Sequence, residues 1–298
     1  MRAFITGSNG FVGRHLEGHL QRSGDDVRGV DMDCDVTDLE SVTRAMRDWH
    51  PEVIYHLAAL THVGESWNEP VLFNRVNVLG TANVLKAART VAPDALVLLV
   101  SSADVYGVVR ESDLPLTETH HPVPVNPYAQ SKREAEQIAF DAFRTEHQRV
   151  IVTRPFNHVG PGQSVQFVVP ALVNRLLDAR EQGLREIAVG DLSARRDFSD
   201  VRDVVRAYRL LMQYGQSGEV YNVASGADVA LTDLAHSLVE MLCPDVQLVE
   251  DPSLMRPVEI PIMRGSIEKL HELTGWEPSI PLATSLNDVV EDLRSRRR

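Results

Sequence analysis

Two side chains in the middle of the sequence could together carry out proton transfer. Tyr128 and Lys132 are four residues apart in the stretch YAQSK, and residues at this spacing share one face of a helix. An ammonium group near a phenol favours the phenolate, so we expect Lys132 to lower the pKa of Tyr128. A tyrosine tuned in this way can exchange a proton with a hydroxyl or carbonyl group of a substrate. An exposed helical pair with no catalytic role would show the same spacing.

A second polar pair follows the apolar run ALVLLV (95–100), in the stretch SSADVYG. The run predicts a buried strand, so Ser102 lies where that strand ends, beside the start of the helix that carries Tyr128. Parallel sheets bind their ligands at this edge. Two interpretations of Asp104 stay open here: a catalytic acid or base, or a polar residue that steadies a loop.

Three glycines in GSNGFVG follow the first predicted strand and open a helix. Gly7, Gly10 and Gly13 have the spacing GxxGxxG, which differs from the commoner GxGxxG. Glycines allow a tight turn, a close approach of the backbone to a pyrophosphate and close packing of helix on strand, and the helix N-terminus attracts the anion. The turn therefore predicts a dinucleotide site. The other residues of the turn that we assign to this site are Asn9, Phe11 and Val12.

The second predicted strand ends in an acidic stretch, DMDCD. A carboxylate at the position of Asp31 can accept hydrogen bonds from the adenosine ribose and repel a 2′-phosphate, which favours NAD(H). The alternative is a surface aspartate in an acid-rich turn, because Asp33 and Asp35 lie nearby.

Strand and helix patterns alternate over about 155 residues, which predicts a parallel sheet with right-handed crossovers. Strands are expected at 2–6, 26–31, 52–59, 95–102, 149–156 and 219–226, and helices at 11–22, 37–50, 68–90 and 126–146. The second helix shows a capping box from Thr37 to Glu40, and the fourth has Asn126 as N-cap and Pro127 as first residue. We predict an α/β fold, a Rossmann-like doubly wound parallel sheet with a smaller α+β C-terminal substrate-binding domain. The dinucleotide-binding domain would take residues 1–157 and about 192–225, and the other domain about 158–191 and 226–298.

Bulk properties exclude several classes of partner. A net charge of −12 argues against binding to nucleic acid or to anionic membranes. Cys34 and Cys243 show no metal-ligand spacing, so no metal site is expected, and a reducing, cytoplasmic location is the default. The first strand begins at once, and no apolar run approaches the ~20 residues of a membrane span, so we expect neither a signal peptide nor a membrane segment.

The motifs TGSNGFVG, HLAA (56–59), SSADVYG, YAQSK and RPFNHVGPG (154–162) occur in one order. Together they resemble the extended short-chain dehydrogenase/reductase family, in the group that modifies nucleotide sugars. The resemblance runs nearly end to end, including RDFSDVRD (196–203), YNVASG and TGWEP. It implies that Tyr128 donates or accepts the proton, that Lys132 holds the nicotinamide ribose and tunes Tyr128, and that Ser102 hydrogen-bonds the reacting sugar oxygen. The further residues that we assign to the cofactor, NADP(H) or NAD(H), are Asp35, Val36, Leu57, Ala58, Ala59, Asn77 and His158.

The resemblance also implies a GDP-sugar substrate, because RPFNHVGPGQ, RDFSDVRD and MRPVE resemble the members that act on GDP-hexoses. The residues that we assign to this substrate are Ser102, Asp104, Tyr128, Asn157, Arg196, Arg256 and Glu259. Arg196 and Arg256 would bind the phosphates, and Glu259 would accept hydrogen bonds from guanine or form a salt bridge within a loop. Arg154 and Arg195 are weaker phosphate candidates.

The motif Ser102-Ala103-Asp104 bears on the reaction. In the 4,6-dehydratases of this family the motif resembles T-x-E or T-D-E, and its glutamate moves the C5 and C6 protons. Asp104 is one methylene shorter, and a displacement of that order can cost ~100-fold in rate. We therefore predict that Asp104 contacts a sugar hydroxyl or anchors the loop.

The resemblance, which in SSADVYG, FNHVGPGQ and TGWEP is to reductases of this family, implies the reduction of the C4 keto group of GDP-4-keto-6-deoxymannose by NAD(P)H, with GDP-6-deoxymannose as the product. A dehydratase or 4-epimerase that recycles its cofactor is the first alternative, and a non-catalytic dinucleotide-binding scaffold is the second. The resemblance further implies a homodimer that forms through the helices around residues 70–90 and 127–145.

Overall fold

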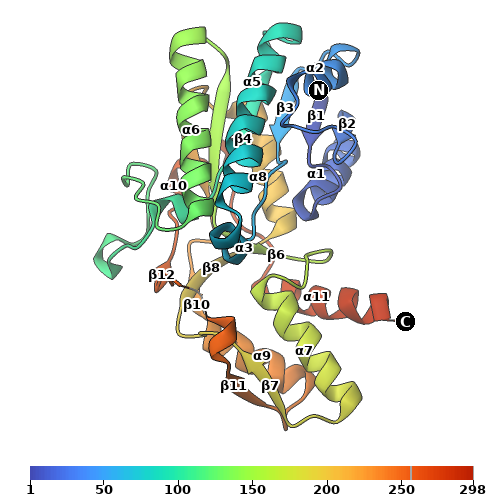
Figure 1. Cartoon of the computed structure of the whole chain (residues 1–298), viewed down its shortest axis with the longest axis vertical. Coiled ribbons are helices and arrows are strands. Elements are labelled where there is room, and N and C mark those ends of the chain that lie inside the picture. Colours follow the sequence, from blue (N-terminus) through green and yellow to red (C-terminus); the bar gives the residue numbers. More distant parts are fainter. Residues whose placement is uncertain (256, 298) are drawn as a thin grey trace.

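The computed structural model describes residues 1–255 and 257–297, and its largest element is a six-stranded parallel sheet (Figure 1). In spatial order the strands are β2 (Asp26–Val30), β1 (Arg2–Thr6), β3 (Val53–His56), β4 (Leu96–Val100), β5 (Val150–Pro155) and β9 (Val220–Val223). The strand order reverses between β1 and β3, and sheets of this kind bind ligands outside the carboxyl ends of the strands at that point. The predicted Rossmann-like sheet is confirmed, including the strand expected near residues 219–226.

Helices cover both faces of this sheet (Figure 1). One face packs against α1 (Phe11–Arg22) and α8 (Val201–Tyr214), and the other against α2 (Leu39–Arg47), α5 (Gly80–Val91) and α6 (Pro127–Glu146). Side chains of a strand alternate between the two faces, so Ala3 and Ile5 enter the core under α1 and α8 while Phe4 enters the core under α2 and α5. Burial on both faces explains the nearly continuous apolar runs of the strands.

The rest of the chain forms a smaller α+β part, at the lower end of Figure 1. Its larger sheet contains β6 (Asn157–Val159), β8 (Arg195–Asp200), β10 (Asp228–Ala230) and β12 (Ile262–Met263), and its smaller sheet contains β7 (Glu186–Val189) and β11 (Gln247–Glu250). Its helices are α7 (Val168–Gln182), α9 (Leu231–Leu242) and α11 (Leu282–Arg297), which share one hydrophobic core. The boundaries between the two domains stay a prediction. Across the described residues, no helix has both the length and the apolar character that crossing a bilayer requires.

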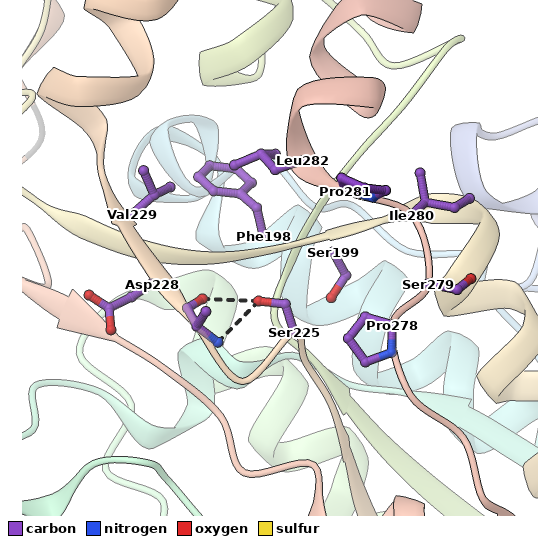
Figure 2. A pocket seen from close by; sticks show the side chains of 11 residues that line it. Phe198, Ser199, Ser225, Asp228, Val229, Pro278, Ser279, Ile280, Pro281 and Leu282 are labelled. Atoms are coloured by element: carbon purple, nitrogen blue, oxygen red, sulfur yellow. Dashed lines mark hydrogen bonds between the residues drawn. The ribbon is translucent and has the colours of Figure 1, made fainter.

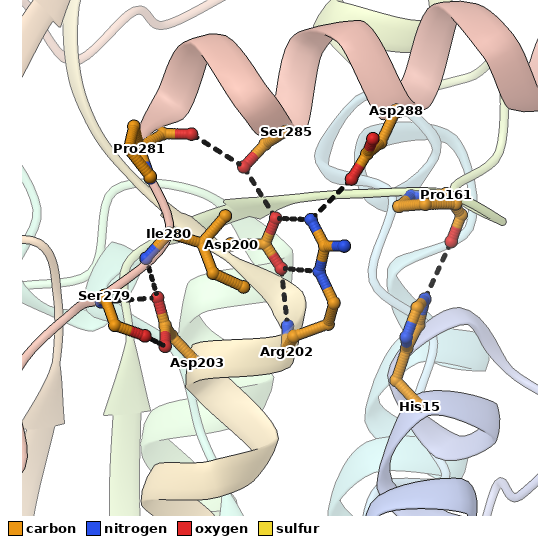
Figure 3. A network of polar contacts seen from close by, with 10 residues as sticks. All are labelled: His15, Pro161, Asp200, Arg202, Asp203, Ser279, Ile280, Pro281, Ser285 and Asp288. Atoms are coloured by element: carbon orange, nitrogen blue, oxygen red, sulfur yellow. Dashed lines mark hydrogen bonds and ion pairs between the residues drawn. The ribbon is translucent and has the colours of Figure 1, made fainter.

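Buried carboxylates at the start of α8 tie this helix to the C-terminal segment (Figure 3). Asp200 accepts a hydrogen bond of 2.6 Å from Ser285 of α11 and two from the guanidinium of Arg202. Asp203 accepts hydrogen bonds from the backbone and hydroxyl of Ser279. A buried carboxylate is tolerated only when donors surround it in this way, so these contacts hold the C-terminal segment against the start of α8.

Two predicted helices differ from the observed ones. The helix predicted at 37–50 begins at Leu39, and Asp38 caps it by accepting a hydrogen bond of 3.0 Å from the Glu40 N–H, so the predicted Thr37–Glu40 capping box is wrong. The helix predicted at 68–90 is interrupted. It consists of α4 (Pro70–Asn74), a π-helical turn (Arg75–Leu79) and α5.

Candidate active site

The glycine turn forms a narrow cradle beside the switch point of the sheet. Gly7 has φ +75°, and a Cβ on it would lie 2.8 Å from the Ala58 nitrogen. A Cβ on Gly13 would lie 2.2 Å from the Gly7 oxygen. Gly10 is the N-cap of α1 and brings no side-chain acceptor, so N–H groups of the first turn are available to an anion. The cradle therefore fits a dinucleotide pyrophosphate.

The acidic stretch after β2 lies against this turn. The Asp31 carboxylate accepts a hydrogen bond of 2.9 Å from the Asn9 N–H, so it lies beside the cradle, and its ribose-binding role stays a prediction. Asp35 closes the next turn by accepting a hydrogen bond of 2.8 Å from the Thr37 N–H, which lowers the pKa of Asp35. Val36 is buried against Gly80.

The loop after β3 forms the opposite wall. Leu57, Ala58 and Ala59 are half-buried there, and Ala58 contacts the glycine turn. Asn77 lies behind this loop, where its side-chain amide bonds the backbone of Leu60 and the hydroxyl of Ser131. Its amide therefore bonds other residues of the protein, although the sequence had suggested a cofactor contact.

The predicted catalytic residues come together at the carboxyl end of β4. Asn126 caps α6 as predicted, because its side chain accepts a hydrogen bond of 2.8 Å from the Ala129 N–H. Tyr128 and Lys132 lie on the buried face of α6. Ser102 caps the short 3₁₀ turn Ala103–Tyr106, and its hydroxyl lies close enough to Tyr128 to affect the pKa of that phenol.

The protonation of these residues differs from the sequence-based expectation. Burial raises the pKa of Tyr128, the negative charge of Asp104 raises it further, and hydrogen bonding to Ser102 acts in the opposite direction. The predicted lowering of this pKa by Lys132 is therefore wrong. Burial lowers the pKa of Lys132 to about 8, and its ammonium donates a hydrogen bond of 2.9 Å to the carbonyl oxygen of Val100. Tyr128 is a neutral phenol at neutral pH, which suits a proton donor.

A buried ion pair supports the same helix and was missed from the sequence. Both oxygens of Glu136 accept hydrogen bonds of 2.8 Å from the guanidinium of Arg154. Ser101 donates a further hydrogen bond of 2.6 Å to Glu136, and the guanidinium lies 4.9 Å from the ring centroid of Tyr106. A charged residue inside a buried strand needs a partner of opposite charge, and this rule could have pointed to the glutamate four residues after Lys132.

Ser102, Asp104 and Tyr128 lie at the main sheet, and the other predicted substrate residues that the structure describes lie in the smaller part of the molecule. Arg196 of β8 forms an ion pair with Glu259. The structure therefore brings together a residue that was assigned to the phosphates and one that was assigned to guanine. Arg195 pairs with Asp228. Asn157 lies half-buried on β6. Arg256 lies outside the described residues.

The ring of His158 contacts Phe11 at the end of the glycine turn. Its ring stacks on Phe11 with 5.9 Å between centroids and 12° between planes, and burial lowers its pKa. His15 of α1 bonds the carbonyl oxygen of Pro161 at 2.8 Å, which fixes the loop after His158 (Figure 3). Val12 is half-buried in the first turn of α1.

A separate cavity of about 340 Å³ lies between β8, β10 and the segment before α11 (Figure 2). Its lining residues are Phe198, Ser199, Ser225, Ala227, Asp228, Val229, Pro278, Ser279, Ile280, Pro281 and Leu282. None of the described residues that the sequence assigned to cofactor or substrate lines it. It is therefore distinct from the candidate active site.

Comparison with known proteins adds to this geometry. The family model described as GDP-mannose 4,6 dehydratase matches residues 32–289. GDP-6-deoxy-D-mannose reductase from Pseudomonas aeruginosa is 39% identical over 301 residues, which cover 100% of this chain and 98% of that protein. GDP-6-deoxy-D-talose 4-dehydrogenase from Aggregatibacter actinomycetemcomitans is 31% identical over 304 residues, which cover 100% of this chain and 98% of that protein.

Solved structures agree. The structure of RMD from Pseudomonas aeruginosa in complex with NADPH matches with a TM-score of 0.90 and 37% identity, over 99% of both chains. The glycine turn, the Ser-Tyr-Lys cluster and these matches, which extend over the whole chain, lead to the same assignment. The chain belongs to the GDP-mannose 4,6 dehydratase family, within the extended short-chain dehydrogenases/reductases.

Proposed function

We propose that the protein reduces the C4 keto group of GDP-4-keto-6-deoxymannose and forms GDP-6-deoxy-D-mannose, with NAD(P)H as reductant. The observation that carries this proposal is the cluster of Ser102, the buried and neutral Tyr128, and Lys132 at the carboxyl end of β4, beside the dinucleotide cradle. The full-length similarity to a GDP-6-deoxy-D-mannose reductase supports the choice of substrate.

The proposed roles follow from the chemistry of each side chain. Bound NAD(P)H supplies the hydride that reduces the carbonyl carbon. Ser102 donates a hydrogen bond to the carbonyl oxygen and polarises it. Tyr128 donates its proton to that oxygen as negative charge develops, and the ammonium of Lys132, one turn further along the same buried face of α6, would hold the nicotinamide ribose. The glycine turn and Asp31 hold the dinucleotide.

Asp104 has a supporting role in this proposal. Its N–H donates a hydrogen bond of 3.2 Å to the Ser102 hydroxyl oxygen, so its backbone helps to fix that hydroxyl. Its charge disfavours ionisation of Tyr128 and so keeps the phenol in the form that can donate a proton. A side chain one methylene shorter than glutamate is badly placed for the C5 and C6 proton transfers of a dehydratase.

The GDP group would bind across the four-stranded sheet that contains β6 and β8. We propose that Arg196 contacts the diphosphate and that Glu259 orients its guanidinium, because the two side chains form an ion pair. Asn157 would face the sugar from β6. A guanidinium fork held in this way can bind phosphate oxygens in a bidentate manner.

We propose that two copies associate through α4, the π-helical turn and α6. Apolar side chains at Val71, Leu72 and Leu79 are 80%, 44% and 44% exposed there, and exposed apolar patches commonly mark interfaces. Sedimentation should give a dimer, and Val71→Glu should shift it toward the monomer. A wild-type protein that sediments as a monomer at micromolar concentration would contradict this.

The two free cysteines suit the reducing environment of the cytoplasm, where we propose that the enzyme works.

The direct test of the function is a turnover assay with purified protein. GDP-4-keto-6-deoxymannose should cause stoichiometric oxidation of NADH or NADPH, followed by absorbance. GDP-mannose with the oxidised cofactor should yield no 4-keto product. Conversion of GDP-mannose to the 4-keto sugar without net use of cofactor would instead establish a dehydratase.

A further inference from the structure

A row of buried side chains connects the strand before the glycine turn to the catalytic helix. On the helix side, Asn77 of the π-helical turn donates a hydrogen bond of 2.9 Å to the hydroxyl of Ser131. That hydroxyl donates one of 2.7 Å to the carbonyl oxygen of Tyr128. The Asn77 amide also bonds both the N–H and the carbonyl oxygen of Leu60, at 2.8 and 3.0 Å. The π-helical turn therefore holds the cofactor loop and the catalytic helix together.

On the strand side, the same row continues through His56. The Thr81 hydroxyl donates a hydrogen bond of 2.6 Å to the carbonyl oxygen of Asn77, and its oxygen lies 3.1 Å from His56 Nε2. His56 Nδ1 lies 2.8 Å from the hydroxyl of Thr6, the residue before Gly7. The Ala58 N–H donates a hydrogen bond of 3.3 Å to that hydroxyl.

The donors and acceptors of this row fit only one arrangement of protons. A hydroxyl group carries one proton, and that of Thr81 is used on the Asn77 carbonyl oxygen. His56 Nε2 must therefore carry a proton and donate it to Thr81. His56 Nδ1 is then an acceptor, and it receives the proton of Thr6. With this arrangement, each donor in the row between the Ala58 N–H and the Tyr128 carbonyl oxygen has an acceptor.

Burial keeps this arrangement free of solvent. Thr6, His56, Asn77, Thr81 and Ser131 are each at most 3% exposed. Burial and the charge of Lys132 lower the pKa of His56 to about 3, so the imidazole stays neutral at working pH. Because low polarity strengthens hydrogen bonds and makes an unpaired group costly, the row should behave as one unit.

We propose that this row, the His56 chain (Ala58, Thr6, His56, Thr81, Asn77, Ser131 and Tyr128), positions the catalytic helix against the dinucleotide cradle, with His56 fixed as the neutral Nε2–H tautomer. His56 and Thr81 are then positioning residues that contact neither cofactor nor substrate. A displacement of about 1 Å between reacting groups can cost ~100-fold in rate. Loss of the hydrogen bonds that connect the dinucleotide cradle to the catalytic helix should therefore lower kcat.

The first test uses the wild-type chain and does not depend on turnover. Histidine-selective ¹⁵N labelling and long-range ¹H–¹⁵N correlation should show one imidazole as the Nε2–H tautomer whose shifts stay constant between about pH 5.5 and 8.5. His56→Gln identifies that signal by its loss. An Nδ1–H tautomer for His56, or titration within this range, would overturn the proposal.

The second test is kinetic and rests on the proposed function. Thr81→Val keeps the shape but removes the link, and it should lower kcat by about tenfold or more while KM for the sugar nucleotide stays within about threefold. Thr81→Ser keeps the hydroxyl and should restore most of the rate. The matched control is Thr90→Val in the same helix, because Thr90 also bonds the carbonyl four residues earlier, at Lys86, but is exposed. It should leave kcat unchanged.

A double variant separates a connected chain from independent packing effects. Thr6 and Thr81 bond opposite sides of His56, so each single change breaks the same chain. If they act through one chain, Thr6→Val/Thr81→Val should be little slower than the slower single variant. Losses that multiply, or a Thr81→Val enzyme with wild-type kcat, would refute the positioning role. If the wild type shows no reductase turnover, the proposed function fails while the tautomer measurement still decides on the chain.

Discussion

The substitution Tyr128→Phe removes the proposed proton donor and leaves the aromatic ring in place. General acid catalysis typically contributes at least ~100-fold, which corresponds to about 2.7 kcal/mol in the activation free energy. Loss of one polar contact typically costs about 1 kcal/mol of stability, so the variant should fold and its Tm should fall by only about 2–4 °C. We therefore expect kcat for reduction of the 4-keto sugar nucleotide to fall at least ~100-fold, with cofactor affinity little changed.

The matched control for this variant is Tyr55→Phe. Tyr55 is another buried tyrosine of the main domain, and its hydroxyl makes no hydrogen bond within the described residues. Its loss should leave kcat and Tm close to those of the wild type. The assay is single-turnover oxidation of NAD(P)H at saturating sugar nucleotide, which reports chemistry without product release. A Tyr128→Phe enzyme within about threefold of the wild type would show that another group delivers the proton.

Three further predictions concern neighbouring residues. Asp31→Ala should raise the ratio of kcat/KM for NADPH over NADH by about tenfold or more, because the carboxylate repels a 2′-phosphate; a wild type that already strongly prefers NADPH would contradict this role. Asp104→Asn should slow reduction by about tenfold or less, and complete loss of activity would instead indicate a catalytic acid. Because the pKa of Lys132 is lowered to about 8, its positive charge is present below that pH and lost above it, so kcat should fall as pH rises through 8. Lys132→Met should be slow at every pH and should lack this fall, and a wild-type profile that stays flat to about pH 9.5 would refute the role of the charge.

Features that depend on nearest neighbours in the sequence could be predicted. The glycine turn follows from the conformations that only glycine adopts easily, and Asn126 caps α6 because an asparagine before a proline suits a helix start. The parallel sheet follows from apolar runs separated by helices. These features need no knowledge of which distant segments meet.

Features that depend on distant contacts could not be predicted. The direction of the Tyr128 pKa shift depends on burial and on the charge of Asp104, both of which the tertiary fold determines. The ion pair of Arg196 and Glu259 joins residues 63 positions apart. The π-helical turn at Asn77 exists where the side chain reaches Leu60 and Ser131, and periodicity alone reads that segment as one continuous helix.

The central claim is that the enzyme adds hydride to C4 of a GDP-4-keto-6-deoxyhexose, and isotope transfer tests it most directly. The measurement uses NAD(P)H that carries deuterium at the transferred position of C4 of the nicotinamide, with analysis of the product by NMR and mass spectrometry. The account predicts one deuterium per product molecule, located at C4 of the sugar, and one cofactor oxidised for each molecule formed. Product without deuterium at C4, or a 4-keto sugar formed from GDP-mannose with no net oxidation of cofactor, would contradict it.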